Sequence, residues 1–292
     1  MAIVECVPNF SEGRDTNKVA GIRRAIVTTS GVALLRWEQD PDHHRSVMTF
    51  AGEPEPVLEA AFRAIQQAAN SIDLTKHTGA HPRIGAADVI PFVPVDGVTI
   101  EDCVRLAHRL GERVWDELKV PVYFYEAAAR HPERVQLENL RRGGFEKPAL
   151  APDLGGPQLH PTAGACVIGA RQFLIAFNIN LATTDVRIAR LIARKIRASS
   201  GGLPFVKAIG VLLESRNLAQ VSMNLTNFEQ TPIHVVFERV RQEAAEHGVE
   251  IAGSEIIGLV PKKALEMTAA HFLKIENFSS SLVLENRLRD LL

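Results

Sequence analysis

The order of strand and helix signals constrains this chain more than any other feature, because one order occurs twice. Alternating apolar residues indicate strands, and apolar residues three or four apart indicate helices. In the first half these signals read strand, helix, strand, strand, helix, strand, at residues 2–8, 15–30, 32–37, 46–50, 54–70 and 89–95. The second half repeats the order at residues 173–178, 184–196, 205–213, 218–224, 231–247 and 249–260. The repeated βαββαβ order predicts an α+β chain within the broad α/β class.

We expect two ferredoxin-like βαββαβ subdomains, each a sheet covered by helices on one face, packed about a substrate cleft. Residues 1–170 form the expected N-terminal subdomain, and residues 171–292 form the C-terminal one. Residues 143–165 are rich in Gly and Pro, and we interpret them as the linker between the halves. Pro91 and Pro94 indicate that the strand at 89–95 is an edge strand or contains a bulge.

Composition excludes several classes of protein. The chain has 292 residues, of which 46% are hydrophobic and 23% charged, which is typical of a globular protein and not of a disordered one. Lys and Arg number 33 against 34 Asp and Glu, so the formal charge of −1 predicts no nucleic-acid partner. Cys6, Cys103 and Cys166 form no CxxC pair, which argues against a disulfide framework and a thiolate zinc site.

The same sequence predicts a cytoplasmic protein with no membrane partner. Glu5 and Pro8 interrupt the N-terminus before a signal-peptide core forms. No uncharged apolar run approaches the roughly 20 residues that span a bilayer.

The most unusual segment is the loop KHTGAHPRIG at residues 76–85. His77 and His81 are four residues apart, which is the spacing of a helical zinc pair, but Gly79 and Pro82 oppose a helix. A histidine on a rigid Gly/Pro loop can move protons near neutral pH. The alternative is an ordinary solvated loop histidine.

A second polar segment, DPDHHR at residues 40–45, joins the two middle strands of the first half. It is either a simple hairpin turn or part of a site. Arg45 has the planar fork that pairs with a carboxylate, and Glu38 can neutralise a cationic substrate group. In the second half, amides and a hydroxyl are expected near the ends of adjacent strands, as caps or as a hydrogen-bonding wall, at Asn178, Asn180, Gln220, Ser222 and Asn224.

Four blocks of the sequence resemble the glutamate formiminotransferases, in the family's order. They are VECVPNFSEGR at 4–14, GAHPRIGAADVIPFVP at 79–94, FLIAFNINL at 173–181 and NLAQVSMNL at 217–225. The similarity covers essentially the whole chain. It implies transfer of a formimino group from N-formimino-L-glutamate to N5 of tetrahydrofolate, a step of histidine degradation and one-carbon metabolism. It also implies two α/β subdomains and a homodimer.

The resemblance assigns the catalytic histidine of the HPR motif to His81. The family's aspartate after the second strand falls at Glu38, with Asp40 beside it. Substrate contacts are expected from Arg45, Arg83, Asn178 and Asn180. The folate-contacting stretch matches Gly155, Gly156, Pro157, Gln158, Leu159, His160, Pro161, Thr162, Ala163 and Gly164. Animal members carry a cyclodeaminase domain as well, and because this sequence stops at Leu292 we expect the transferase activity alone.

Chemistry on these residues needs tetrahydrofolate as co-substrate and no metal. Three alternatives stay open at this point. The first is transfer of a formyl group, which differs from formimino by one heteroatom. The second is a folate- or amino-acid-binding module without catalysis. The third is a metal hydrolase that uses His43, His44, His77 and His81.

Overall fold

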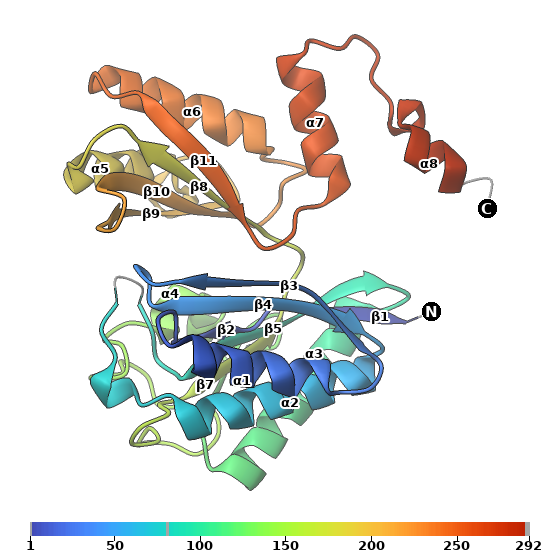
Figure 1. Cartoon of the computed structure of the whole chain (residues 1–292), viewed down its shortest axis with the longest axis vertical. Coiled ribbons are helices and arrows are strands. Elements are labelled where there is room, and N and C mark those ends of the chain that lie inside the picture. The colour runs from blue at the N-terminus through green and yellow to red at the C-terminus, as the bar shows by residue number, and fades with distance from the viewer. Residues whose placement is uncertain (1, 80–81, 290–292) are drawn as a thin grey trace. The chain divides into compact units, whose positions relative to one another are not determined.

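The structure, a computed structural model, describes residues 2–79 and 82–289. The chain divides into two units, Met1–Phe173 and Leu174–Leu292, and each has its own sheet (Figure 1). The mixed α/β class with two sheets is therefore confirmed.

Local signals place the elements of the first unit. Its strands are β1 (Ile3–Cys6), β2 (Asn9–Phe10), β3 (Val32–Asp40), β4 (Arg45–Gly52), β5 (Ala87–Asp96), β6 (Val122–Glu126) and β7 (Cys166–Ala170). Its helices are α1 (Thr16–Val27), α2 (Pro54–Ser71), α3 (Ile100–Arg113) and the short α4 (Leu137–Leu140). Asp15 caps α1 by accepting hydrogen bonds from two backbone N–H groups, and Thr99 and Asp102 form the capping box of α3.

The first sheet has an interior β5. In the described part of the unit, β3 pairs with β4, and both β1 and β2 lie between β4 and β5. β5 pairs on its other side with β7, in parallel, and β7 pairs with β6. The expectation of an edge strand at 89–95 is thus wrong, whereas the bulge is present. The pairing with β1 skips Val95, and the pairing with β2 skips Asp88.

The Gly- and Pro-rich segment 143–165 belongs to the first unit. β7 follows it and pairs with β5 and β6, and the backbone N–H of Val122 donates to Leu154 O within that segment at 3.0 Å. Its interpretation as a linker between the halves is therefore wrong. Sequence composition identified a loop but could not show that the next strand returns to the first sheet.

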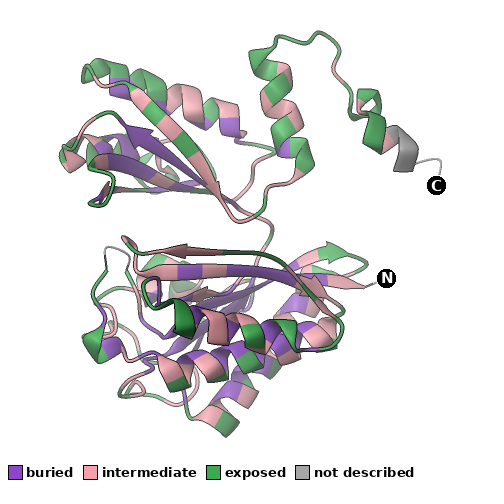
Figure 2. Ribbon diagram, viewed as in Figure 1, coloured by how far each residue is buried: buried purple, intermediate pink, exposed green. Residues whose placement is uncertain are grey.

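Helices α1, α2 and α3 cover one face of the first sheet (Figure 1). Residues at helical spacing on α2, such as Val57, Ala61 and Ile65, are buried, as the sequence predicted. Strand β6 shows how the two faces differ. Val122 and Phe124 belong to the core that the three helices close, whereas Tyr123 and Tyr125 join a second cluster that contains Leu140 of α4. Figure 2 shows the buried residues concentrated in the strands.

The second unit follows the predicted order βαββαβ. Its elements are β8 (Ile175–Leu181), α5 (Val186–Ile196), β9 (Val206–Leu213), β10 (Leu218–Leu225), α6 (Ile233–Glu246) and β11 (Ile251–Ile257), followed by α7 (Lys262–Phe272) and α8 (Leu284–Arg289). The strands form an antiparallel sheet in the order β11, β8, β10, β9. This strand order does not conflict with the ferredoxin-like layout.

One face of the second sheet is apolar and the other is polar. Gly210 of β9 lies so close to α5 that an added Cβ would be 2.3 Å from Arg190 N. Val221 and Ile179 share that face through the strand register. Asn180 and Gln220 therefore point away from α5, as the period of two in a strand requires.

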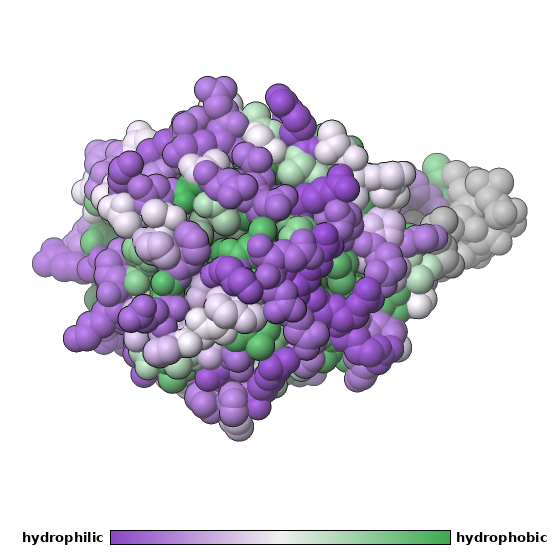
Figure 3. All heavy atoms as spheres, turned by 90° about the horizontal axis from the view of Figure 1, so that it is seen from below, coloured by the Kyte–Doolittle hydropathy of each residue, from purple (hydrophilic) through white to green (hydrophobic). Residues whose placement is uncertain are grey.

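Three further observations bear on the sequence analysis. Among the described residues, no helix is both long and apolar enough to cross a bilayer. Viewed from below, the surface is mainly hydrophilic, with hydrophobic areas scattered across it (Figure 3). Cys6, Cys103 and Cys166 are buried free thiols.

Candidate functional site

Three segments of the first unit meet beside the start of β5. Ser11 donates its backbone N–H to Ala86 O at 2.9 Å and its hydroxyl to Gly85 O at 2.7 Å. Arg14 donates from Nε to Pro41 O in the β3–β4 turn at 3.1 Å. The candidate site consists of the segments that these bonds join, residues 9–15 and 38–45 together with the described residues 74–79 and 82–88.

His81, the expected proton carrier, lies outside the described residues, as does Ala80. Its acid/base role stays a prediction. The residues on either side, up to Gly79 and from Pro82 onward, are described.

A carboxylate and two imidazole rings form a compact group in this site. His44 directs Nε2 to Glu12 Oε1 at 3.0 Å and Nδ1 to Thr78 O at 2.8 Å. Its ring stacks on that of His77, with 4.0 Å between ring centroids and 8° between ring planes. His77 in turn directs Nε2 to His44 O at 3.0 Å. The β3–β4 turn is thus fastened to the loop that leads into the HPR motif.

Both ring nitrogens of His44 face acceptor oxygens. A carbonyl oxygen only accepts hydrogen bonds, so Nδ1 donates to Thr78. Glu12 Oε1 also accepts from the backbone N–H groups of Arg14 and Asp15, at 2.9 and 3.0 Å. Burial alone would raise the pKa of Glu12, but these bonds and the one from His44 outweigh burial and lower the pKa. The carboxylate of Glu12 is thus held as an acceptor at the point where the Arg14–Asp15 backbone and the His44 ring meet.

His77 is the neutral ring of the stack. Its Nε2 carries the hydrogen that is donated to His44 O, so Nδ1 keeps a lone pair. This Nδ1 is buried and has no hydrogen-bond partner among the described residues. Burial lowers the pKa of His77, and the positive charges of His44 and Arg83 lower it further. The ring therefore presents a buried proton acceptor.

Backbone geometry keeps this group compact. His44 has a φ of 49°, in the left-handed region that few residues other than glycine adopt. A Cβ added to Gly79 would lie 2.7 Å from His44 Cβ and 2.8 Å from His43 O. Position 79 therefore accepts only glycine without movement of the turn.

The two candidate acidic residues on the hairpin have different surroundings. Asp40 Oδ2 lies 2.6 Å from His43 Nδ1. Burial alone would raise the pKa of Asp40, but its hydrogen bonds with His43 outweigh burial and lower it. Glu38 pairs with Arg36 at 2.7 Å and lines a surface pocket of about 560 Å³. The pocket is formed by Gly13, Arg14, Thr16, Trp37, Glu38, Gln39 and Pro41.

Arg45 contacts Asn9 of β2 and Asp88 at the bulge of β5. Its Nε donates to Asn9 Oδ1 at 2.9 Å, and its Nη1 lies 3.5 Å from Asp88 Oδ2. Asp88 Oδ1 accepts from the backbone N–H groups of Ile84 and Gly85, at 2.8 and 3.3 Å. Burial lowers the pKa of Arg45 to about 9. The bulge explains this arrangement, since it turns the Asp88 carboxylate toward the loop.

Arg83 links the HPR loop to the segment after α4. Its Nη2 donates to Glu146 Oε1 at 2.7 Å and to His77 O at 3.0 Å. A buried Nε of Arg83 has no partner in the described part of the chain. Its expected contact with a substrate stays a prediction.

The expected folate-contacting stretch, residues 155–164, packs directly against the candidate site. Leu74 N donates to Thr162 O at 2.8 Å, and Ala86 N donates to Ala163 O at 2.9 Å. Gly164 has a φ of 70°, and a Cβ there would lie 2.1 Å from Ile84 O. The glycine thus allows the close approach of the two loops.

Asn178 and Asn180 belong to the second unit and form a separate polar group. Gln220 donates from Nε2 to Asn180 Oδ1 at 2.9 Å and to Glu255 Oε1 at 2.6 Å. The strand register pairs Gln220 with Asn180 and Ser222 with Asn178. Asn180 and Asn224 each lie one residue before the end of a strand, as expected, whereas the other three residues lie further inside β8 or β10.

Sequence reasoning missed three charged residues of the first unit. Glu12 and Asp88 lie inside two of the blocks that carry the resemblance, and a charged residue inside such a block is the signal that could have identified them. Arg141 has none, because it lies in an irregular segment and reaches Asp88 across 53 positions of the chain.

The metal-hydrolase alternative finds no support in the described residues. No three or more His, Cys, Asp or Glu side chains converge there in a way that could hold a metal ion. His43 instead pairs with Asp40, and His44 stacks on His77.

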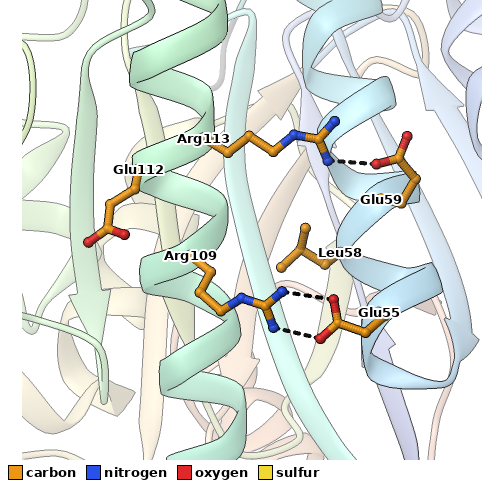
Figure 4. A pocket seen from close by; sticks show the side chains of 6 residues that line it. All are labelled: Glu55, Leu58, Glu59, Arg109, Glu112 and Arg113. Atoms are coloured by element: carbon orange, nitrogen blue, oxygen red, sulfur yellow. Dashed lines mark hydrogen bonds and ion pairs between the residues drawn. The ribbon is translucent and has the colours of Figure 1, made fainter.

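A second surface pocket, of about 500 Å³, lies between α2 and α3 and is lined by ion pairs (Figure 4). Arg109 binds Glu55 through two bonds of 2.6 and 2.8 Å, and Arg113 binds Glu59 at 2.6 Å. Because these charges neutralise one another across the two helices, the pocket is explained by helix packing.

Comparison with known proteins agrees with the resemblance. Residues 3–171 match the formiminotransferase domain, N-terminal subdomain, and residues 176–289 match the formiminotransferase domain. The chain is 48% identical over 297 residues to the glutamate formimidoyltransferase of Thermoplasma acidophilum, covering 99% of this chain and 98% of that protein. It is 45% identical over 294 residues to the Streptococcus pyogenes enzyme of the same name, covering 98% of each.

A longer relative matches over part of its length. Formimidoyltransferase-cyclodeaminase of Sus scrofa is 46% identical over 288 residues, which cover 94% of this chain and 53% of that protein. Both family models and the full-length relatives lead to one conclusion: the chain belongs to the formiminotransferase family.

Proposed function

We propose that this protein transfers the formimino group from N-formimino-L-glutamate to N5 of tetrahydrofolate, giving 5-formiminotetrahydrofolate and L-glutamate. The observation that carries the proposal is the 48% identity, over nearly the whole of both chains, to a protein named glutamate formimidoyltransferase. Tetrahydrofolate enters as co-substrate. No atom changes its oxidation state in the transfer, so no redox cofactor takes part.

The reaction requires two proton movements. N5 attacks the amidine carbon and forms a tetrahedral adduct, after which N5 loses a proton and the departing glutamate nitrogen gains one. A single histidine can act first as base and then as acid. We assign this role to His81. The support is its place in the HPR motif at residues 81–83; Arg83, the last residue of the motif, is bonded to His77 O, and His77 is bonded to His44 O.

The charges of the site suit the donor. Its amidine is largely protonated at neutral pH, and we assign Glu38 or Asp40 to stabilise this cation. The lowered pKa keeps Asp40 ionised, and Glu38 lines the pocket of about 560 Å³. Arg45 or Arg83 is assigned to a donor carboxylate, because a guanidinium group forms paired hydrogen bonds with one.

Folate is expected to contact residues 155–164, which pack against the HPR loop, and Asn178 and Asn180 are proposed to contact substrate from the second unit. The subdomain division at residues 1–170 and 171–292, the homodimer, the cytoplasmic location and the absence of nucleic-acid and membrane partners are parts of the same proposal. Light scattering on the purified protein tests the dimer.

The test mixes the protein with N-formimino-L-glutamate and tetrahydrofolate. Acid converts the 5-formimino product to the methenyl form with loss of ammonia, and the methenyl form absorbs in the near ultraviolet. The parent should give this signal, and His81→Ala should lose about 10²- to 10⁴-fold in rate. Equal rates in the two proteins would remove His81 from the mechanism. Turnover of N-formyl-L-glutamate alone would indicate formyl transfer, and binding without turnover would indicate a binding module.

A further inference from the structure

Arg141 places a guanidinium group on the face of the first sheet that lies away from α1, α2 and α3. It directly follows α4, whose Leu140 packs with Tyr123 and Tyr125 on that face. Arg141 Nη2 donates to Asp88 Oδ2 at 2.5 Å. Its side chain is 12% exposed, so it is mostly buried but still reachable from solvent.

Asp88 is shared between two arginines. The same oxygen, Oδ2, lies 3.5 Å from Arg45 Nη1, and the Asp88 side chain is 1% exposed. Its other oxygen is occupied by the backbone N–H groups of Ile84 and Gly85. One carboxylate therefore faces two guanidinium charges. Tyr125, which also neighbours Arg45, adds no negative charge, because burial raises the pKa of its hydroxyl to about 12.

Arg141 also has an unused donor. Its Nε is buried and has no hydrogen-bond partner among the described residues. Buried donors without partners are rare in folded proteins and call for an explanation. A guanidinium group has five N–H donors in a planar fork that matches a carboxylate. A carboxylate that reaches the partly exposed guanidinium group of Arg141 would fit this fork.

The location is suited to a substrate group. Ile84 and Gly85, which Asp88 holds, come directly after Arg83 of the HPR motif. Arg83 is itself bonded to Glu146, five residues after Arg141. Arg141 is therefore connected to the residues that follow the HPR motif through a single side chain, that of Asp88.

We propose that Arg141, oriented by Asp88 beside Arg45, binds a glutamate carboxylate of a substrate. This rests on the proposed function, because N-formimino-L-glutamate and the tail of tetrahydrofolate both carry such carboxylates. The ligand chemistry is the same in the two cases. The experiment distinguishes the two sources.

The experiment compares the full-length parent with Arg141→Met, Arg141→Lys and Arg142→Met. Arg142 is the matched control, because it is the next residue and is exposed. Calorimetry measures binding of L-glutamate, and initial rates give KM and kcat for each substrate. Arg141→Met should weaken L-glutamate binding about 10- to 100-fold, as expected for loss of a charged hydrogen-bonding group, and raise KM for the donor equally.

The kcat of Arg141→Met should change little, because the proposal gives Arg141 a binding role. Arg141→Lys keeps the ion pair with Asp88 and should lose less affinity, because it loses the fork and not the charge. Arg142→Met should match the parent. Should Arg141→Met fail to fold, Arg141→Lys carries the test alone.

The remaining outcomes are distinct. A rise in KM for tetrahydrofolate, absent with an analogue that lacks the glutamate tail, would assign the site to that tail. Unchanged affinity for both substrates in folded Arg141→Met would overturn the proposal. Absence of turnover in the parent would overturn the proposed function instead, while Arg141-dependent binding of L-glutamate would still support this site. A parent that binds neither L-glutamate nor the folate tail would overturn the proposed carboxylate site at Arg141.

Discussion

The imidazole rings of His44 and His77 stack with 4.0 Å between their centroids and 8° between their planes. Both nitrogens of His44 face acceptor oxygens, and burial lowers the pKa of His77. Glu12 is bonded to the His44 ring, and each histidine is also bonded to the other's segment of backbone. Three loops that are distant in sequence thereby hold the residues that lead into the HPR motif.

Substitution of His44 by asparagine tests the stack. Asparagine tolerates the left-handed backbone at position 44, so His44→Asn removes the ring and the bond to Glu12 without adding backbone strain. We expect the free energy of unfolding to fall by about 1–3 kcal/mol and the transfer rate to fall by about 10²-fold. Urea unfolding and initial rates measure the two effects. The exposed His247→Asn serves as control, and a His44→Asn protein that behaves like it would show that the stack has no such role.

The neutral His77 predicts a pH dependence. Its folded-state pKa is lowered by burial from the ordinary value of 6.5, so below about pH 6.5 the unfolded chain binds a proton that the folded chain does not. Stability should therefore fall as the pH decreases from about 6.5 toward 5. Thermal unfolding across this range should show a shallower decline for His77→Gln than for the parent. Some decline should persist, because burial also lowers the pKa of His160 and His234. A slope equal to the parent's would contradict the assignment.

Asp88 accepts two backbone hydrogen bonds and forms ion pairs with two arginines. Asp88→Asn tests what its negative charge contributes. The amide keeps the size of the side chain but leaves Arg45 and Arg141 without their shared negative charge. Loss of one partner from a buried ion pair costs about 3–5 kcal/mol, and we expect a loss of this order. Chemical denaturation measures it. Asp116→Asn, at an exposed position, should be close to neutral.

Substitution of Gly164, with Gly201 as the control position, tests whether the 155–164 loop needs a glycine to approach Ile84 closely. Both have positive φ, of 70° and 82°, but an added Cβ at 164 would lie 2.1 Å from Ile84 O, whereas nothing lies within 4 Å at 201. Gly201→Ala should cost only the backbone penalty of about 1–2 kcal/mol. Gly164→Ala should cost more and should also raise KM for tetrahydrofolate. Equal melting temperatures and equal KM values for the two variants would refute the proposed packing.

The three cysteine thiols should be unreactive toward thiol reagents in the folded protein. Burial raises the pKa of the Cys103 thiol to about 11 and raises those of Cys6 and Cys166 as well. The thiolate is the reactive form, so all three should resist an aromatic disulfide reagent until the protein unfolds. Absorbance of the released thiolate, with and without denaturant, measures this. Rapid reaction of the native protein would show that its core opens readily.

Much of the fold could be predicted because its signals are local. Periodicity predicted the βαββαβ order of each half, and local capping groups such as Thr99 and Asp102 fix where helices begin. Strand pairing is not a local property. It depends on which distant backbone groups satisfy one another, which explains why β5 is interior and why β7 returns to the first sheet after residues 143–165.

The candidate site divides along the same line. Unusual residue types singled out the HPR loop and the DPDHHR turn as candidates, and the family resemblance alone singled out residues 155–164. Only the tertiary structure brought His44 to Glu12 across 32 positions and Arg141 to Asp88 across 53. Protonation and charge balance follow from these contacts. An imidazole or guanidinium group acquires its role from the acceptors and charges around it, and the folded chain alone decides which of them are near.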